Sequence, residues 1–241
     1  MEYYQYYLMG IVLLPAILFA VIAQARVNST FDKYSRVASS KNIPAYMVAE
    51  KMLEKKRIRD VVVKRVSGKL TDYYSDSEKV VALSEDIYSS SSISAIGVAM
   101  HEVGHAIQYA EGYKMIMVRN LMIRTSRISS ILLWPLVVIG LIFNLAVVGG
   151  GLFGQICLWG GIGFFSISIL LNLVTLPVEY NASNRAKELM EKEGILTKQE
   201  TQSAAKVLNA AALTYVASLV VSIFYLVRFL LVVFLNSRRR D

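Results

Sequence analysis

The sequence predicts a mostly α-helical, polytopic membrane protein that carries a small α+β domain at the membrane surface. Of its 241 residues, 55% are hydrophobic, a larger share than a water-soluble domain usually contains. These residues are concentrated in four long runs with almost no charges, and each run is long enough for a helix to cross a hydrocarbon layer about 30 Å thick. Two polar stretches separate the runs, and they supply the sequence for the domain outside the membrane.

The four apolar runs set the expected order of the chain. We expect transmembrane helices at 3–23, 128–148, 152–176 and 210–235. Four crossings place both ends of the chain on one side, so the segments 24–127 and 177–209 meet on the other side and form one domain. A cleavable signal peptide is the alternative for the first run. Because such a peptide begins with positive charge and Glu2 is the only charged residue among the first seven, we expect a retained anchor.

The distribution of basic residues predicts an orientation. Lysines and arginines flank the spans on the side of the two polar segments, whereas the glycine hairpin at 149–151 carries no charge. Because positively charged loops stay in the cytoplasm, the polar domain of this multi-pass cell-membrane protein is predicted to face the cytoplasm, although Arg238, Arg239 and Arg240 oppose this. The net charge of +8 does not indicate nucleic-acid binding, because the basic residues are scattered at span ends, where lipid headgroups explain them.

The polar segment before the second span is predicted to contain two helices and a short pair of strands. Apolar residues at helical spacing indicate a helix over 42–59. The valine-rich runs 61–63 and 80–83 are typical of strands. The serines at 89–92 are suited to cap a helix, and the periodicity that follows predicts a helix over 93–110.

The helix at 93–110 carries the pentapeptide HEVGH at 101–105, which contains both histidines of the chain. Residues four apart lie on one helix face, so His101 and His105 can bind one zinc ion, with Glu102 beside it as general base. The pattern predicts one Zn²⁺ per chain and hydrolysis of amide bonds in protein or peptide substrates, membrane proteins included. The alternatives are two histidines bonded to protein partners and a zinc site without catalysis.

A catalytic zinc site needs a third protein ligand. Glu111, six residues after His105, is one candidate, but the metzincin pattern requires glycine where this chain has Gln108. Glu179 is the better candidate, because it follows Pro177, which is expected to begin a helix where the third span leaves the membrane. The alternative interpretation of Glu179 is a glutamate that only stabilises the first turn of that helix.

The stretch AIGVAMHEVGHAIQ at 95–108, together with LPVEYNASNRA at 176–186, resembles the YugP-type membrane zinc metalloproteases, also called neutral zinc metallopeptidases, over nearly the whole chain. At the level of the fold, the arrangement is similar to membrane gluzincins, in which a downstream glutamate completes the zinc site. The resemblance implies a membrane-bound zinc metalloendopeptidase with a zincin-like catalytic domain and Glu179 as the third ligand.

The chain departs from the gluzincin pattern at two places. Ser183 stands where those proteases usually have an aspartate that orients a histidine, and outer partners of this kind tune the metal. The segment 72–76 lacks the histidine that the family is expected to have beside its aspartate, so the role of that histidine is not carried over. The chain also has no third histidine to stabilise the oxyanion. The candidates for that role are Arg185, Tyr180, Tyr73 and Tyr74.

The sequence leaves alternatives for how the substrate binds and for whether the protein is a protease. An extended peptide can add itself to an exposed edge of the strands within 61–83. A non-catalytic zinc-binding membrane scaffold or adaptor is the alternative to a protease. An intramembrane protease would need its motif inside an apolar run, whereas HEVGH follows a polar serine-rich segment, so we expect chemistry at the membrane surface.

Overall fold

The computed structural model describes residues 10–146 and 151–238, and the chain divides into two compact units. The first unit comprises Met1–Ile22, Val118–Thr175 and Tyr215–Asp241, and the second comprises Ala23–Met117 and Leu176–Thr214. The first nine residues, most of the glycine hairpin, and Arg239 and Arg240 lie outside the described residues. The domain limits expected at 24–127 and 177–209 stay a prediction.

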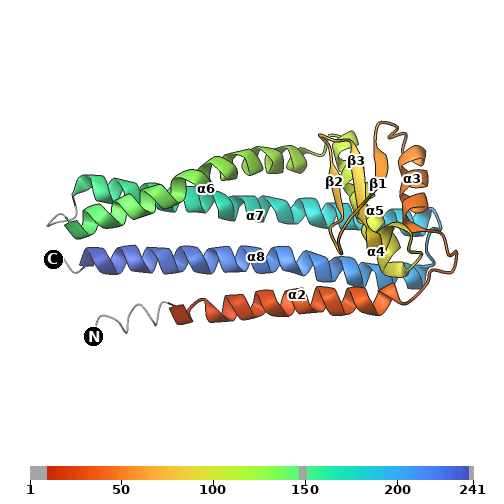
Figure 1. Ribbon diagram of the computed structural model, residues 1–241, viewed down its shortest axis with the longest axis horizontal. Helices are drawn as coiled ribbons and strands as arrows, with labels where there is room; N and C mark the ends of the chain where they lie inside the picture. Colours follow the sequence, from red (N-terminus) through yellow and green to blue (C-terminus); the bar gives the residue numbers. More distant parts are fainter. Residues whose placement is uncertain (1–9, 147–150, 239–241) are drawn as a thin grey trace. The chain divides into compact units, whose positions relative to one another are not determined.

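Within the described residues, four helices are long and apolar enough to cross a membrane, which confirms the expected number of candidate spans. They are α2 (Leu14–Ser35), α6 (Lys114–Ala146), α7 (Leu152–Lys192) and α8 (Lys198–Arg238), labelled in Figure 1. Helices α6, α7 and α8 continue well beyond the apolar runs into charged sequence. Hydropathy measures the apolar run alone, whereas backbone hydrogen bonding continues the helix past it.

Pro177 lies inside α7, which corrects the expectation that it begins a new helix. Proline has no N–H to bond to the preceding turn, but long membrane helices tolerate this loss. Because the helix is continuous, Glu179 is carried on a direct extension of the third apolar run.

In the first unit, α6 and α7 come close together at Gly161. A Cβ atom on Gly161 would lie only 2.9 Å from the Val137 side chain. Between α7 and α8, Asn172 Nδ2 donates a hydrogen bond to Ser222 Oγ at 2.8 Å. Small residues and side-chain hydrogen bonds of this kind hold helices together in lipid.

The second unit contains a three-stranded sheet in the order β1-β3-β2. Strands β1 (Val62–Val66) and β3 (Val80–Ser84) pair in parallel, so the two valine-rich runs do pair. The structure adds β2 (Tyr73–Ser75), antiparallel to β3, in the polar sequence between the two valine-rich runs, where no strand was expected. All five residues of β3 are buried, whereas β1 and β2 are edge strands and partly exposed.

Two longer helices pack in the second unit beside this sheet, with the short α4 (Glu85–Tyr88) between β3 and α5. Helix α3 (Ala45–Lys55) is shorter than the predicted 42–59, because Pro44 takes its N-cap position and the positive φ of Arg57, 61°, prevents its continuation. Helix α5 (Ile93–Ala110) has the predicted bounds.

The core of the second unit explains why α5 was predictable. Ser92 caps the helix, its Oγ accepting from the Ala95 N–H at 3.2 Å, as the serine cluster indicated. The apolar residues at helical spacing are buried in the core that α5 shares with α3 and β3. They include Ile96, Met100, Val103 and Ile107. Burying this face leaves the motif residues of α5 to face α7 and β2.

Candidate metal centre

Helices α5 and α7 bring together three side chains suited to bind a metal, His101, His105 and Glu179. The two Nε2 atoms of His101 and His105 lie 3.3 and 3.4 Å from Glu179 Oε2, and one ligand atom from each residue lies within 4.8 Å of the others. The imidazole rings meet edge to face, with centroids 4.7 Å apart. Their side chains are only 16% and 10% exposed and that of Glu179 only 3%.

Close packing at Gly104 permits this convergence. A Cβ atom at Gly104 would lie 2.6 Å from the backbone oxygen of Ala182, so only glycine lets α5 come this near α7. On α7, Glu179, Ala182, Ser183 and Ala186 are all buried and recur at helical spacing. The small residues on this face leave room for the imidazoles.

Gln108 fixes the orientation of the His105 ring. Its Nε2 donates to the backbone carbonyl of Val178 at 2.8 Å and to Asn181 Oδ1 at 2.9 Å. The Asn181 atom must be oxygen, because Arg185 Nε, which can only donate, bonds to it at 2.8 Å. The Gln108 atom 2.9 Å from His105 Nδ1 is therefore the carbonyl oxygen, and His105 donates to it. A neutral His105 ring consequently carries no proton on Nε2.

Ser183 lies beside the other ring, with its Oγ 3.1 Å from His101 Nδ1. When His101 Nδ1–H donates to that oxygen, its Nε2 is also free of a proton. Two bare imidazole nitrogens then face the Glu179 carboxylate, so three acceptors meet with no donor among them. A divalent cation satisfies such a cluster, and two imidazoles with one carboxylate fit zinc.

Glu102 is buried beside this cluster, with 8% of its surface exposed. Burial raises the pKa of Glu102 to about 7, and the neighbouring carboxylates of Glu179 and Asp72 act in the same direction. An electrostatic interaction with the His101 side chain and a hydrogen bond from the Tyr74 backbone lower the pKa in part. These interactions place the Glu102 carboxylate close to His101 and Glu179 on one side and to β2 on the other.

Glu111, the alternative third ligand, is not part of the cluster. Its carboxylate accepts a hydrogen bond from Arg185 Nη1 at 2.5 Å, and its side chain is 51% exposed. Arg185 thus links Glu111 to Asn181 and, through it, to Gln108. This guanidinium, a candidate for oxyanion stabilisation, therefore already has two partners.

The three tyrosine candidates differ in their surroundings. The Tyr74 hydroxyl donates to Asp76 Oδ1 at 3.1 Å, and burial together with this bond raises the pKa of Tyr74. Tyr73 and Tyr180 are 42% and 43% exposed. Tyr74 therefore already has a carboxylate partner, as Arg185 does.

Sequence reasoning missed the network behind His105. Gln108 follows His105 by three residues, and this spacing on one helix face was the available signal for a contact. Asn181 and the Val178 carbonyl gave no such signal, because they lie on α7, 73 and 70 positions from Gln108. Gln108 had been considered only as the residue that breaks the metzincin pattern.

Comparison with known proteins agrees with this geometry. A family model described as "Putative neutral zinc metallopeptidase" matches residues 9–234. The chain is 43% identical over 217 residues to the protein of Bacillus subtilis (strain 168) named "Putative membrane protease YugP", covering 90% of this chain and 92% of that protein. No solved structure matches the chain. With a family match along nearly its whole length and a side-chain cluster that could hold a metal on two of its helices, the chain belongs to the putative neutral zinc metallopeptidase family.

Proposed function

We propose that this protein is a membrane-bound zinc endopeptidase, with His101, His105 and Glu179 as ligands of one zinc ion and Glu102 as general base. The observation that carries the proposal is the convergence of the His101 and His105 side chains on the buried carboxylate of Glu179, next to the second buried carboxylate of Glu102. The family match supports the same chemistry.

The side chains divide the work of peptide hydrolysis. Zinc, when bound, supplies Lewis acidity that makes a water molecule acidic near pH 7 and polarises the scissile carbonyl. Glu102 takes the proton from the attacking water and passes it to the amine nitrogen of the departing product. Gln108 and Ser183 hold the two rings through Nδ1 and so keep both Nε2 atoms directed at the metal.

Strand β2 is the edge at which we propose that the substrate binds. It is an edge strand of the sheet, and its Tyr74 backbone bonds to Glu102. An extended peptide that pairs with β2 would place a main-chain carbonyl near the base, and its side chains would be selected by the surrounding pockets. Such binding predicts a broad sequence preference.

The oxyanion donor can be identified by removing single hydroxyl groups. Tyr73→Phe, Tyr74→Phe and Tyr180→Phe each delete one hydroxyl and keep the ring. Loss of the true donor should lower kcat roughly 100- to 1000-fold with little change in KM. If all three variants keep full kcat, Arg185 is the remaining candidate.

The decisive experiment compares Glu102→Gln with Glu188→Gln in protein purified in detergent and loaded with zinc. Fluorescein-labelled casein serves as an unstructured substrate. Removing the general base should lower kcat by roughly 100- to 10,000-fold. Zinc content should stay at one ion per chain, because Glu102 is not proposed as a ligand. Glu188 is an exposed glutamate of α7, and its replacement should leave kcat unchanged.

A non-catalytic zinc scaffold predicts a different result. In that case neither the Glu102→Gln nor the Glu188→Gln variant hydrolyses casein or a membrane-protein substrate, and the cellular function of the protein survives Glu102→Gln. Full function of Glu102→Gln in cells that depend on the protein would therefore overturn the protease proposal while leaving the metal site intact.

We also propose that the second unit faces the cytoplasm, on the basis of the lysines and arginines beside the spans. Four crossings would then place the C-terminus on the outer side. Alkaline phosphatase fused after Asp241 should be active, and green fluorescent protein fused at the same position should be dark. The reverse pattern would show that the catalytic unit faces outwards.

A further inference from the structure

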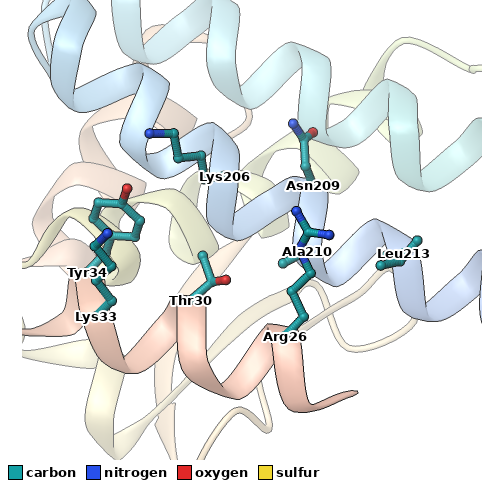
Figure 2. A pocket seen from close by; sticks show the side chains of 8 residues that line it. All are labelled: Arg26, Thr30, Lys33, Tyr34, Lys206, Asn209, Ala210 and Leu213. Atoms are coloured by element: carbon teal, nitrogen blue, oxygen red, sulfur yellow. The ribbon is translucent and has the colours of Figure 1, made fainter. Parts of the chain in front are cut away.

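A cavity of about 430 Å³ lies in the second unit between one face of α2 and one face of α8. Figure 2 shows Arg26, Thr30 and Lys33 following one another along α2. From α8, Lys206, Asn209 and Leu213 line the same space. Both sets recur at helical spacing, so each helix gives a continuous face to the cavity. We call this space the basic cavity.

The positive charge of the basic cavity is not neutralised by the protein. Arg26, Lys33 and Lys206 line it, and no carboxylate does. Across residues 10–146 and 151–238, none of these three cations forms an ion pair, whereas Lys79 of the same unit pairs with Asp76 at 2.7 Å. Three uncompensated cations around one cavity attract an anion.

Neighbouring groups hold the cations in place and add neutral donors. The Tyr34 hydroxyl is hydrogen-bonded to Lys206, and the Lys33 ammonium lies 5.5 Å from the centre of the Tyr34 ring. The Thr30 hydroxyl and the Asn209 amide are on the same walls. Phosphate oxygens accept charge-assisted hydrogen bonds from lysine and arginine, so this set of donors suits a phosphate group.

The position of the basic cavity along the helices distinguishes between sources of phosphate. Arg26 follows the apolar residues of α2, which end at Ala23, and Lys206 precedes the apolar stretch of α8, which begins at Ala210. Leu213 adds an apolar wall on the side of that stretch. In a bilayer, lipid phosphates lie at this boundary, with the acyl chains on the apolar side, and basic pockets between membrane helices bind acidic headgroups.

We propose that the basic cavity binds the phosphate group of an acidic phospholipid headgroup. Free phosphate offers the same charge but makes no use of the apolar wall. A zwitterionic lipid would bring its own cation next to Arg26, Lys33 and Lys206, so it should bind more weakly. This lipid site is separate from the metal centre and does not depend on the proposed hydrolysis.

The test titrates phosphatidylglycerol into the full-length protein in phosphatidylcholine–detergent micelles, with bound lipid counted by native mass spectrometry. Each cation near an acidic lipid contributes roughly fivefold in affinity, so the triple variant Arg26→Gln, Lys33→Gln, Lys206→Gln should bind roughly 100-fold more weakly. The control variant Lys51→Gln, Arg59→Gln, Lys64→Gln changes three other exposed cations. Both variants lower the net charge from +8 by three, to +5.

The proposed lipid site is supported if the first triple variant binds phosphatidylglycerol more weakly and the control variant binds it like wild type. Equal loss in both variants would show that overall charge governs binding and would overturn the proposal, as would undiminished binding in the first. Displacement of phosphatidylglycerol by an equal concentration of inorganic phosphate would assign the cavity to free phosphate instead. If the triple variant does not fold, as judged by zinc content and melting, Lys33→Gln and Lys206→Gln replace it, each with a roughly fivefold loss expected.

Discussion

The candidate metal centre gathers three possible ligand atoms within 4.8 Å of one another, whereas the basic cavity gathers three cations around about 430 Å³ of space. His105 and Glu179 of the candidate metal centre are buried and His101 is only 16% exposed, and Gln108 and Ser183 each lie within hydrogen-bonding distance of one imidazole. The cations of the basic cavity stand on long exposed side chains.

This difference separates two ways of binding an ion. In a buried cluster whose side chains are held by hydrogen bonds, each ligand atom is in position before the ion binds. The loss of one contact therefore lowers the affinity for the ion strongly. Exposed cations attract through charge with little fixed geometry, so their contributions are small, additive and sensitive to salt. The predictions below test this contrast, beginning with the largest expected effect.

Removing the central carboxylate should have the largest effect. Glu179→Ala deletes one of three ligands, so its zinc affinity should fall by more than the roughly 100-fold that outer partners can account for. Competition with a chromogenic chelator measures this affinity. Glu111→Gln removes the alternative ligand and should keep zinc binding close to wild type. Zinc lost from Glu111→Gln and kept by Glu179→Ala would reverse the ligand assignment.

Breaking the support of His105 should have the next largest effect. Gln108→Met keeps the size of the side chain but removes the acceptor for His105 Nδ1, so zinc affinity should fall about 10- to 100-fold. Gln202→Met, at an exposed position of α8, is the matched control and should change nothing. A Gln108→Met protein that melts like wild type and still binds zinc equally well would show that the His105 ring is held by packing alone.

The close approach of α5 to α7 can be tested at Gly104. Gly104→Ala places a Cβ atom 2.6 Å from the Ala182 carbonyl, and overpacking of this kind costs about 1–3 kcal/mol. Gly97→Ala is the control on the same helix, because the nearest atom to its Cβ would be the Ala204 Cβ at 3.3 Å, and the Ala204 backbone atoms would be no nearer than 3.7 Å. Denaturant unfolding in detergent should show a clearly larger loss for Gly104→Ala. Equal losses would mean that this contact does not set the helix spacing.

Salt should separate the two sites. Raising ionic strength from about 0.1 to 1 M shortens the Debye length from about 10 to about 3 Å. Phosphatidylglycerol binding should weaken severalfold, because the cations of the basic cavity are exposed. Zinc affinity, measured in the same buffers with a chelator calibrated in each, should change less. Equal weakening of both ligands would contradict the distinction between buried and exposed sites.

Asp72, a half-buried acid, provides the smallest test. Burial raises the pKa of Asp72, and hydrogen bonds from Ser84 offset this only in part. Since the folded state holds the proton more tightly than the unfolded state, this group's stabilising contribution is present below the ordinary aspartate pKa and is lost as pH rises through the raised value. The difference in melting temperature between Asp72→Asn and wild type should therefore shift in favour of the variant as the pH rises from 4, near the ordinary aspartate pKa, to 7. A difference that stays constant over this range would exclude the raised pKa.

The sequence-based predictions were accurate where the signal lies within one segment and failed where it depends on contacts between segments. Helix α5 was predicted with the right bounds because its cap at Ser92 and its apolar period lie within the helix. Pro177 was misjudged because the rule for proline at helix starts takes no account of a long membrane helix. Strand β2 was missed because three residues show no period, and only its pairing with β3 makes it a strand.

The sequence by itself determined the four candidate spans and the pair of histidines on one face of α5, because run length and helical spacing are properties of a single segment. It also made Glu179 the leading candidate for the third ligand. The tertiary structure alone decided that Gln108 holds His105 through Asn181, and that two charged helix faces enclose one cavity. These contacts join residues far apart in the chain, so they depend on how closely the helices pack, as Gly104 shows against Ala182.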